Sequence, residues 1–291
     1  MSHFACLVTG EDVDSQLAPF DENRKMPPTR VYLSDSEVRA VAEHYHLDPA
    51  DLDAVAAKVE AWSGREGGRD DRGVSSNSTA NPRAKWDWWE VGGRFSGFFT
   101  PKPGSGGVLG GTGTPDAFVR RHGEAAPEPR GVDEILKGDV DVAAMEAVAE
   151  TEARKTWALY AAATAGTPVH TPWAAFVARV DAHELTIEEA RERYHEQPRI
   201  AAFDASPLGQ RFAASADGFP ASEAAYVRRE RQAAICPFAV LHEGAWRERG
   251  EMGWFGVVRD ERATDAWMRE VRQLWKQLPD DTRLAIVDCH I

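Results

Sequence analysis

The chain has 291 residues, of which 43% are hydrophobic and ten are tryptophan, and its formal net charge is -13 at pH 7. This apolar content is enough for a large core, which excludes an intrinsically disordered chain. Non-specific binding to nucleic acid needs a basic field, so the acidic charge argues against nucleic acid as a partner.

The cysteines Cys6, Cys236 and Cys289 lie far apart in the sequence. Their spacing fits neither a disulfide framework nor a zinc knuckle, so we expect reduced thiols and a cytoplasmic location. The start "MSHFACLVTG" has no basic region of a signal peptide, and no uncharged segment approaches roughly 20 residues. We therefore expect neither export nor a membrane partner.

The first part of the chain predicts one strand followed by two helices. "HFACLVTG" is a short apolar run closed by Gly10, which is typical of a buried strand. Residues 34–46 and 48–62 have helical patterns, and the second helix has Asp48 as its expected N-cap. Residues 64–84 are polar and rich in glycine and serine, which predicts an exposed loop or an irregular hairpin.

The stretch "NPRAKWDWWEVGGRFSGFF" concentrates aromatic residues around a pair of glycines. Type I' and II' turns need positive φ, so Gly92-Gly93 predicts a β-hairpin over residues 84–100. This register divides the side chains into two faces: Trp86, Trp88, Glu90, Phe95 and Phe99 on one, and Asp87, Trp89, Arg94 and Phe98 on the other.

Two interpretations of this hairpin are open. In the first it packs into the core, with an Asp87–Arg94 pair at the rim. In the second it lines an aromatic cleft in which Arg94 binds a carboxylate or phosphate and a tryptophan stacks on a base or sugar. The candidate ligand-binding residues are Trp86, Asp87, Trp88, Trp89 and Arg94.

Residues 132–234 predict a mostly helical insertion. A long alanine-rich helix is expected from Asp139 or Asp141 to near Gly166, with further helices over 171–181 and 222–234. Between them, "TIEEARERYHEQP" carries a capping box of Thr186 with a glutamate three residues on, and its helix is expected to end before proline.

The last 57 residues predict strands over 235–246 and 250–258, an amphipathic helix over 263–278 and a final strand over 282–291. With the first strand this gives the order β-α-(insertions)-β-β-α-β, that of the ferredoxin-like or split βαβ fold. We predict an α+β fold that forms one elaborated domain over 1–291. Its core comprises residues 1–63 and 235–291, and the helical insertion and the aromatic hairpin elaborate it.

In that topology the first and last strands are antiparallel neighbours, which brings His3 close to His290. Asp288 and His290 share one face of the final strand, and Cys289 faces the other way. The predicted catalytic residues are therefore His3, Asp288 and His290, acting as a base with its orienting group or as ligands of zinc or another divalent metal. The alternative is that these polar residues simply contact solvent.

Other reactive side chains favour structural roles. Alternation turns Cys289 toward the core, which indicates a buried structural thiol. His195 lacks the second histidine of an HExxH zinc site and fits a helix end. Glu248 and Glu251 flank Gly250, and charged turn residues have the same pattern as a pair of catalytic carboxylates.

Several segments together resemble an uncharacterised family of bacterial, phage and prophage proteins: "MSHFACLV", "KWDWWEVGGRFSGFF", "KGDVDVAAMEA", "ERYHEQP", "WRERGEMGWFGVV" and "LPDDTRLAIVDCHI". Members commonly carry KWDWxxxGGRxSGF and end in VDCHI, and the likeness runs nearly end to end. Here Phe95 stands where tryptophan is usual and Glu90 where glutamine is frequent, while Asp87 and Arg94 are kept. The resemblance implies a single full-length unit and a phage or mobile-element context, without an activity.

We expect a protein that binds or hydrolyses a small nucleotide-like or phosphate-bearing ligand. Trp88, Trp89 and Arg94 would bind the ligand, and His3, Asp288 and His290 would supply the chemistry. The alternative is a noncatalytic phage or prophage accessory protein that binds or inhibits a host protein, or sequesters a small aromatic ligand.

Overall fold

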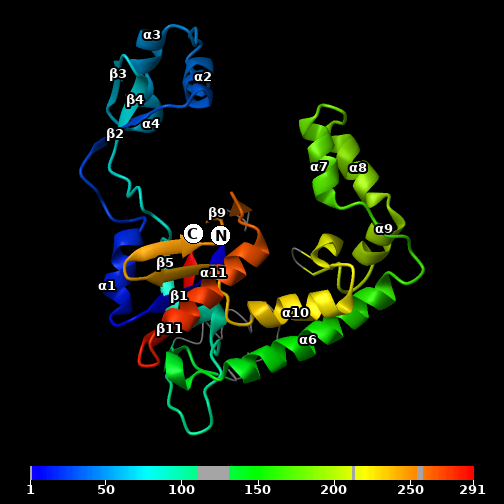
Figure 1. Cartoon of the computed structure of the whole chain (residues 1–291). Helices are drawn as coiled ribbons and strands as arrows, with labels where there is room; N and C mark the ends of the chain where they lie inside the picture. The colour runs from blue at the N-terminus through cyan, green and yellow to red at the C-terminus, as the bar shows by residue number, and fades with distance from the viewer. Residues whose placement is uncertain (1, 111–130, 212–213, 254–257) are drawn as a thin grey trace, which may run out of the picture.

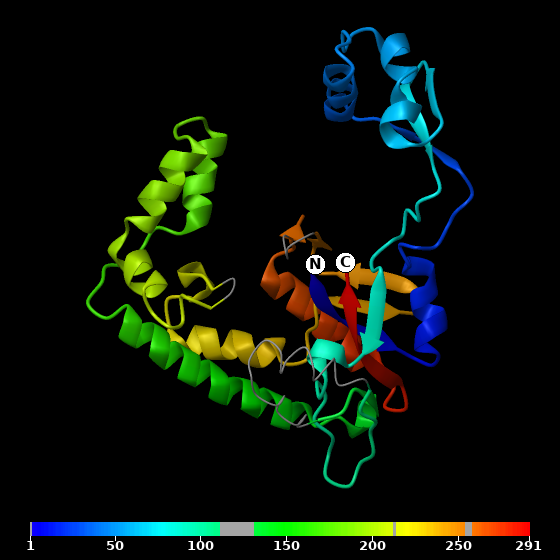
Figure 2. The same cartoon turned by 180° about the vertical axis from the view of Figure 1, so that it is seen from behind.

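The computed structural model describes residues 2–110, 131–211, 214–253 and 258–291. Figures 1 and 2 show a central sheet flanked by helices, a small lobe, and an arm built from helices. Both chain ends lie together beside the central sheet (Figure 1). Their backbones are hydrogen-bonded in both directions, at 3.0 Å from Ser2 N to the Ile291 carbonyl and 3.1 Å in return.

The central sheet has the strand order β5-β11-β1-β7-β8, with β6 also paired to β11. The strands are β1 (His3–Thr9), β5 (Trp88–Val91), β6 (Glu134–Leu136), β7 (Ala239–His242), β8 (Ala245–Glu248) and β11 (Arg283–His290). β1 and β11 are antiparallel and pair along the whole of β1, from His3 opposite His290 to Thr9 opposite Leu284. The predicted pairing of the first and last strands is therefore confirmed.

The α+β class is confirmed, but the ferredoxin-like arrangement is not found. A split βαβ unit places another strand between β1 and β7, whereas here these two strands pair directly and run parallel. A tight turn at Glu243 and Gly244, with φ of 50° and 73°, folds β8 back on β7, and β8 is the edge strand. The segment predicted as one strand over 235–246 thus contains β7, this turn and the start of β8.

The segment predicted as a strand over 250–258 contributes to a separate two-stranded sheet. Its strands are β9 (Glu251–Met252) and β10 (Val258–Arg259). Residues 254–257 of that prediction lie outside the described residues.

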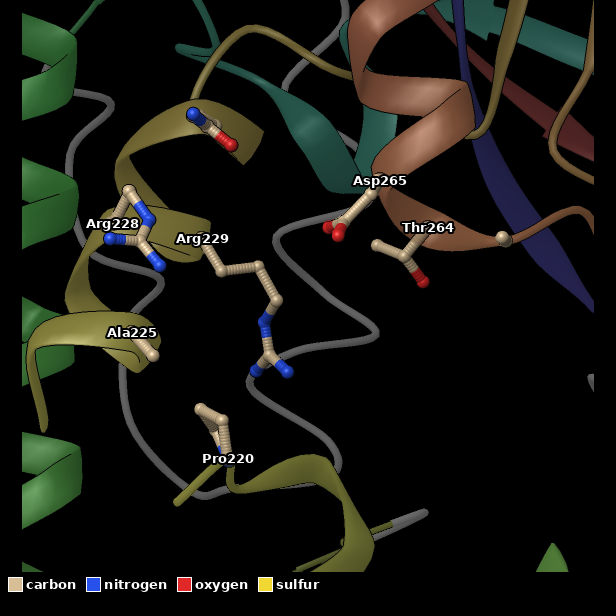
Figure 3. Close-up of a pocket in the computed structure, with 8 residues that line it drawn as sticks. Pro220, Ala225, Arg228, Arg229, Thr264 and Asp265 are labelled. Carbon is tan, nitrogen blue, oxygen red and sulfur yellow. The ribbon is translucent and has the colours of Figure 1, made fainter. Parts of the chain in front are cut away.

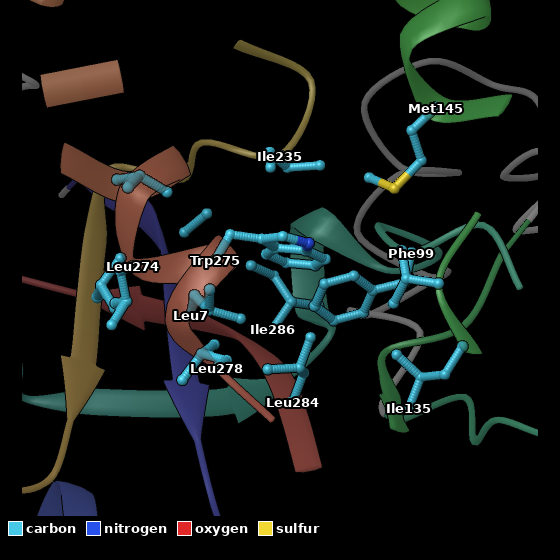
Figure 4. Close-up of a cluster of buried hydrophobic side chains, with 14 of the residues drawn as sticks. Leu7, Phe99, Ile135, Met145, Ile235, Leu274, Trp275, Leu278, Leu284 and Ile286 are labelled. Carbon is cyan, nitrogen blue, oxygen red and sulfur yellow. The ribbon is translucent and has the colours of Figure 1, made fainter. Parts of the chain in front are cut away.

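Strand alternation gives the central sheet two apolar faces. On one face, α11 (Thr264–Gln277) packs Leu274 and Trp275 against Leu7, Leu284 and Ile286, as Figure 4 shows. The stripe predicted for this helix is buried as expected: Trp267, Val271, Leu274, Trp275 and Leu278. The other face is covered by α1 (Val13–Leu17) and the short 3-10 helix η1 (Ala18–Phe20).

The predicted aromatic hairpin is wrong. β5 pairs with β11, and after Val91 the chain turns at the two glycines into the short 3-10 helix η2 (Gly93–Phe95). Pairing with a long neighbouring strand satisfies the backbone of β5 without a local hairpin. The predicted faces change accordingly: Trp86 and Trp89 both join the cluster on the α1 face, while Trp88 lies on the α11 face and is 49% exposed.

Residues 29–78 form the small lobe, which has its own sheet and apolar cluster. Residues 29–63 were predicted to belong to the core of the domain, but in the structure they belong to this lobe. Its sheet has the order β2-β4-β3, and the predicted irregular hairpin is present as β3–β4. The second predicted helix is broken in two and is capped by Asp51 rather than Asp48. The elements are β2 (Thr29–Tyr32), α2 (Asp35–His44), α3 (Leu52–Ala56), α4 (Val59–Ser63), β3 (Gly67–Asp70) and β4 (Gly73–Ser78).

The helical arm agrees well with its prediction. Its helices are α6 (Val142–Ala163), α7 (Trp173–Asp181), α8 (Ile187–His195), α9 (Pro198–Asp204) and α10 (Glu223–Ala233). Asp141 caps α6, and the capping box at Thr186 is present. Pro198 begins α9 instead of only ending α8, because proline suits a first helical position. Within the described ranges, no helix combines the length and apolar character of a membrane span.

Candidate functional site

The three neighbouring strands β5, β11 and β1 bring three rings to one end of the α11 face. His3 is directly opposite His290, and their ring centroids are 4.8 Å apart with an interplanar angle of 70°. Trp88 is opposite His290 on the other side, and its ring is edge-on to His3 at 6.5 Å. The predicted proximity of His3 and His290 is confirmed.

His3 is oriented by Asp288, whose carboxylate lies 2.9 Å from the ring through Oδ1 and His3 Nδ1. The backbone N–H of Arg94 donates to Oδ2 of the same carboxylate at 2.9 Å. Asp288 is 1% exposed, so both bonds are shielded from water. An ionised carboxylate only accepts, so Nδ1 carries the proton and Nε2 of the neutral ring has a free lone pair.

His290 has a carboxylate of its own. Its Nδ1 is 2.6 Å from Oδ1 of Asp87, and the Asp87 backbone N–H donates to the His290 carbonyl at 3.0 Å. Asp87 directly precedes β5, and its position is therefore fixed by the same strand pairing that places His290. The predicted partner of Asp87 was Arg94, but its partner in the structure is the histidine. Two His–Asp dyads thus lie side by side.

The pKa of His3 is lowered from its ordinary value of 6.5, and burial is the main cause. The Asp288 carboxylate raises this pKa through its hydrogen bond and charge, but not enough to reverse the shift. The electrostatic influence of the neighbouring Arg94 and His290 side chains lowers it further. His3 is consequently neutral at pH 7, and the charge of Arg94 acts at its ring.

The glycine pair predicted as a hairpin turn has a different role at this site. Gly93 has φ of +52°, and a Cβ there would lie 2.5 Å from Cβ and 2.6 Å from Oδ2 of Asp288. Only a residue without a side chain lets η2 approach so closely, and this approach brings the Arg94 N–H to the carboxylate. The Arg94 side chain itself is exposed.

Sequence reasoning missed Asp133, which is fully buried beside the site. Its carboxylate accepts hydrogen bonds from Ser96 Oγ at 2.9 Å, Gly97 N at 2.6 Å and Gly110 N at 2.8 Å, and so fixes the segment after η2. Glu90 is opposite Asp288 in the ladder, and its pKa is raised by burial and by the charges of Asp288 and Asp133. No local pattern around Asp133 in the sequence marks these distant donors.

The ligand-binding candidates separate into two groups. Trp86 is 8% exposed, donates from Nε1 to the Leu17 carbonyl at 3.3 Å and packs with Trp89 in the core. Trp88 and Arg94 are exposed on the side of the dyads. Trp86 and Trp89 therefore pack in the core, and Trp88 and Arg94 are the candidates that are still accessible to a ligand.

A metal ion at these residues stays a prediction. Among the described residues, no group of three or more histidine, cysteine or acidic side chains is placed to hold a metal ion. Both oxygens of Asp288 already accept hydrogen bonds, which favours it as an orienting group of His3 rather than as a direct ligand.

The remaining reactive side chains have structural partners. Cys289 is 0% exposed, and its pKa is raised by burial and by the neighbouring Cys6, as expected of a buried structural thiol. His195 pairs with Asp204 at 3.0 Å on the exposed arm. Glu248 accepts from Lys85 Nζ at 2.6 Å, so it stabilises the fold.

A cavity of about 440 Å³ lies between α10 and the start of α11 (Figure 3). Its lining includes Arg228 and Arg229 from α10 and Thr264 and Asp265 from α11. Arg229 forms an ion pair with Glu230 at 2.7 Å, and Asp265 brings a carboxylate to the same lining. These opposite charges do not make a dedicated anion site, and the cavity shares no residue with the dyads.

No protein-family model, curated protein or solved structure matches this chain. The resemblance to a bacterial and phage family stays a prediction.

Proposed function

We propose that the protein is a hydrolase that acts on a small phosphate-bearing ligand such as a nucleotide. The observation that supports this most directly is the pair of His–Asp dyads, whose rings are 4.8 Å apart. Two imidazole rings that are oriented and close together can act in the same reaction: one takes a proton from the attacking group, and the other gives a proton to the leaving group.

His3 is the general base, because its lowered pKa leaves it neutral and Asp288 holds its Nδ1–H. Its Nε2 removes a proton from water, and the water oxygen attacks phosphorus. The phosphorus–oxygen ester bond then breaks, and protonated His290 gives its proton to the leaving oxygen. Asp87 stabilises that imidazolium through its 2.6 Å contact, and exchange with solvent restores both rings.

Ligand binding is assigned to Arg94 and Trp88. A guanidinium presents paired donors that match a phosphate, and the charge of Arg94 acts at the His3 ring. Trp88 is 49% exposed and lies beside His3, so part of its ring is accessible for a nucleobase to stack on. The expected loss for Trp88→Ala is in KM, with little loss of stability.

The test is hydrolysis of bis(p-nitrophenyl) phosphate, p-nitrophenyl phosphate and a panel of nucleotides by the wild type and by His3→Gln and His290→Gln. Each substitution should lower kcat on the order of a hundredfold or more. His195→Gln is the matched control, because His195 also pairs with an aspartate but lies on α8.

Turnover that survives in His290→Gln would contradict the acid role. Metal analysis of the purified protein, with activity measured before and after chelation, decides between paired acid–base chemistry and the metal site predicted from His3, Asp288 and His290.

The alternative proposal is a noncatalytic phage or prophage accessory protein that binds a host protein. The small lobe supports it with two exposed apolar side chains, Val31 at 49% and Trp62 at 40%. Ligand binding without turnover, together with a stoichiometric complex lost in Trp62→Ser, would favour this alternative. Both proposals keep the cytoplasmic location expected from the free cysteines Cys6, Cys236 and Cys289.

A further inference from the structure

We infer that the helical arm holds a second binding site, for a small carboxylate with a flat apolar body. A cavity of about 530 Å³ lies there, within the usual size of a small-molecule site. It is bounded by the end of α6, the connection from Thr164 to Pro172, Arg199 of α9, the 3-10 helix η4 (Ala216–Gly218) and Phe219. It shares no residue with the His–Asp dyads.

The apolar part of the cavity is an aromatic wall. Tyr160 and Phe219 stack at 4.1 Å with an interplanar angle of 2°. The Trp157 ring is tilted against both of them, with its centroid 5.4 Å from that of Tyr160 and 6.3 Å from that of Phe219. Phe219 also stacks on Tyr226 at 5.0 Å, and Tyr160 is only 5% exposed, so the wall is rigid and offers an apolar ligand a limited contact area at little entropic cost.

The first polar group of the cavity is His170, whose side chain is 9% exposed. Its Nε2 contacts Oδ1 of Asp217 at 2.7 Å, and the other oxygen of Asp217 accepts the Trp173 N–H at 2.8 Å. Within the described part of the chain, His170 Nδ1 is buried without a hydrogen-bond partner. Such a buried atom is costly, and a ligand group bonded to it removes the cost.

The second polar group is Arg199, which is held in place from one side. Its Nε and Nη2 donate to Oγ1 and to the carbonyl of Thr167 at 3.2 and 2.8 Å. A guanidinium has five N–H donors, so this fixed group retains donors for a ligand. With the remaining donors of Arg199 in its lining, the cavity is suited to a carboxylate, which accepts from the guanidinium.

The test is isothermal titration with benzoate, phenylacetate and indole-3-acetate, with benzyl alcohol as the matched probe without a carboxylate. At least one carboxylate should bind, and Arg199→Met should weaken it about tenfold or more. Ala161→Trp should abolish binding, because Ala161 lines the cavity and is exposed, so the larger side chain fills it without removing a core contact. The matched control is Ala162→Trp, which is exposed on the same helix outside the lining and should bind normally.

Several outcomes would overturn the inference: no heat from any carboxylate at millimolar concentration, equal binding of benzyl alcohol, or full binding in Ala161→Trp. Circular dichroism of each variant separates loss of the site from loss of the fold. The double variant His3→Gln/His290→Gln should bind the carboxylate as the wild type does. The test of this site is therefore independent of the test of the proposed hydrolase activity.

Discussion

Asp288→Asn tests the central feature of the proposed site, the orientation of His3 by a buried carboxylate. Asparagine has the same shape, but its amide nitrogen only donates. Its oxygen must stay with the Arg94 N–H, so the amide nitrogen faces His3 Nδ1. The ring proton must then move from Nδ1 to Nε2, and His3 can no longer act as a base.

The size of the effect follows from two hydrogen bonds, each 2.9 Å long. A bond to a charged group contributes about 1.5–3 kcal/mol and a neutral bond about 1 kcal/mol, so with two such bonds weakened the variant should lose roughly 1–4 kcal/mol of stability. The pKa of His3 should fall further, because Asp288 raises it. Hydrolysis should fall by roughly 10²–10⁴, the usual share of a general base.

The assay is nitrogen-15 NMR of the imidazole rings, which distinguishes the two tautomers and gives the pKa of His3 by titration. Urea denaturation measures the stability of the same samples. Asp204→Asn is the control, since it changes the exposed partner of His195. A wild-type His3 protonated on Nε2, or a variant with an unchanged or higher pKa, would refute the orientation by Asp288.

Three further predictions concern stability. Because the folded pKa of His3 is lowered, the unfolded state binds more protons than the folded state below pH 6.5. The free energy of unfolding, measured in urea, should therefore fall on acidification from that pH. A His3→Gln variant with the same dependence of stability on pH as the wild type would contradict this. Gly93→Ala should cost about 2–4 kcal/mol of stability, because alanine is strained at positive φ and its Cβ clashes with Asp288. The control Gly64→Ala, with φ of +67° and open space around it, should cost only about 1 kcal/mol. Equal losses of the two variants in thermal and urea unfolding would contradict the clash with Asp288. Glu90→Gln should stabilise the protein at pH 7 by less than about 1 kcal/mol, because the folded pKa of Glu90 is raised. The gain should vanish below pH 4.5, where this carboxyl is protonated in both the folded and the unfolded state. A variant that is less stable than the wild type in urea at pH 7 would contradict the repulsion between Glu90 and Asp288.

The sequence by itself determined the elements whose signals are local. The start of the long helix at Asp139 or Asp141, the capping box at Thr186 and the apolar stripe of α11 each depend on residues within a few turns. In the structure the helix is capped by Asp141, and the other two features are found as predicted. The antiparallel pairing of the first and last strands was also predicted, and with it the contact between His3 and His290. Alternation alone placed Cys289 in the core.

Only the tertiary structure decided how distant segments pair. A two-glycine turn is a strong local signal for a hairpin, but the backbone of β5 is paired with the distant strand β11, and Gly93 instead allows a close approach to Asp288. The same holds for the strand order, because the local turn at Glu243 and Gly244 is compatible with either strand of the β7–β8 hairpin beside β1, and in the structure β7 takes that place. Partners separated by a hundred residues or more leave no periodicity in the chain, so the Asp87–His290 dyad could not be predicted from it.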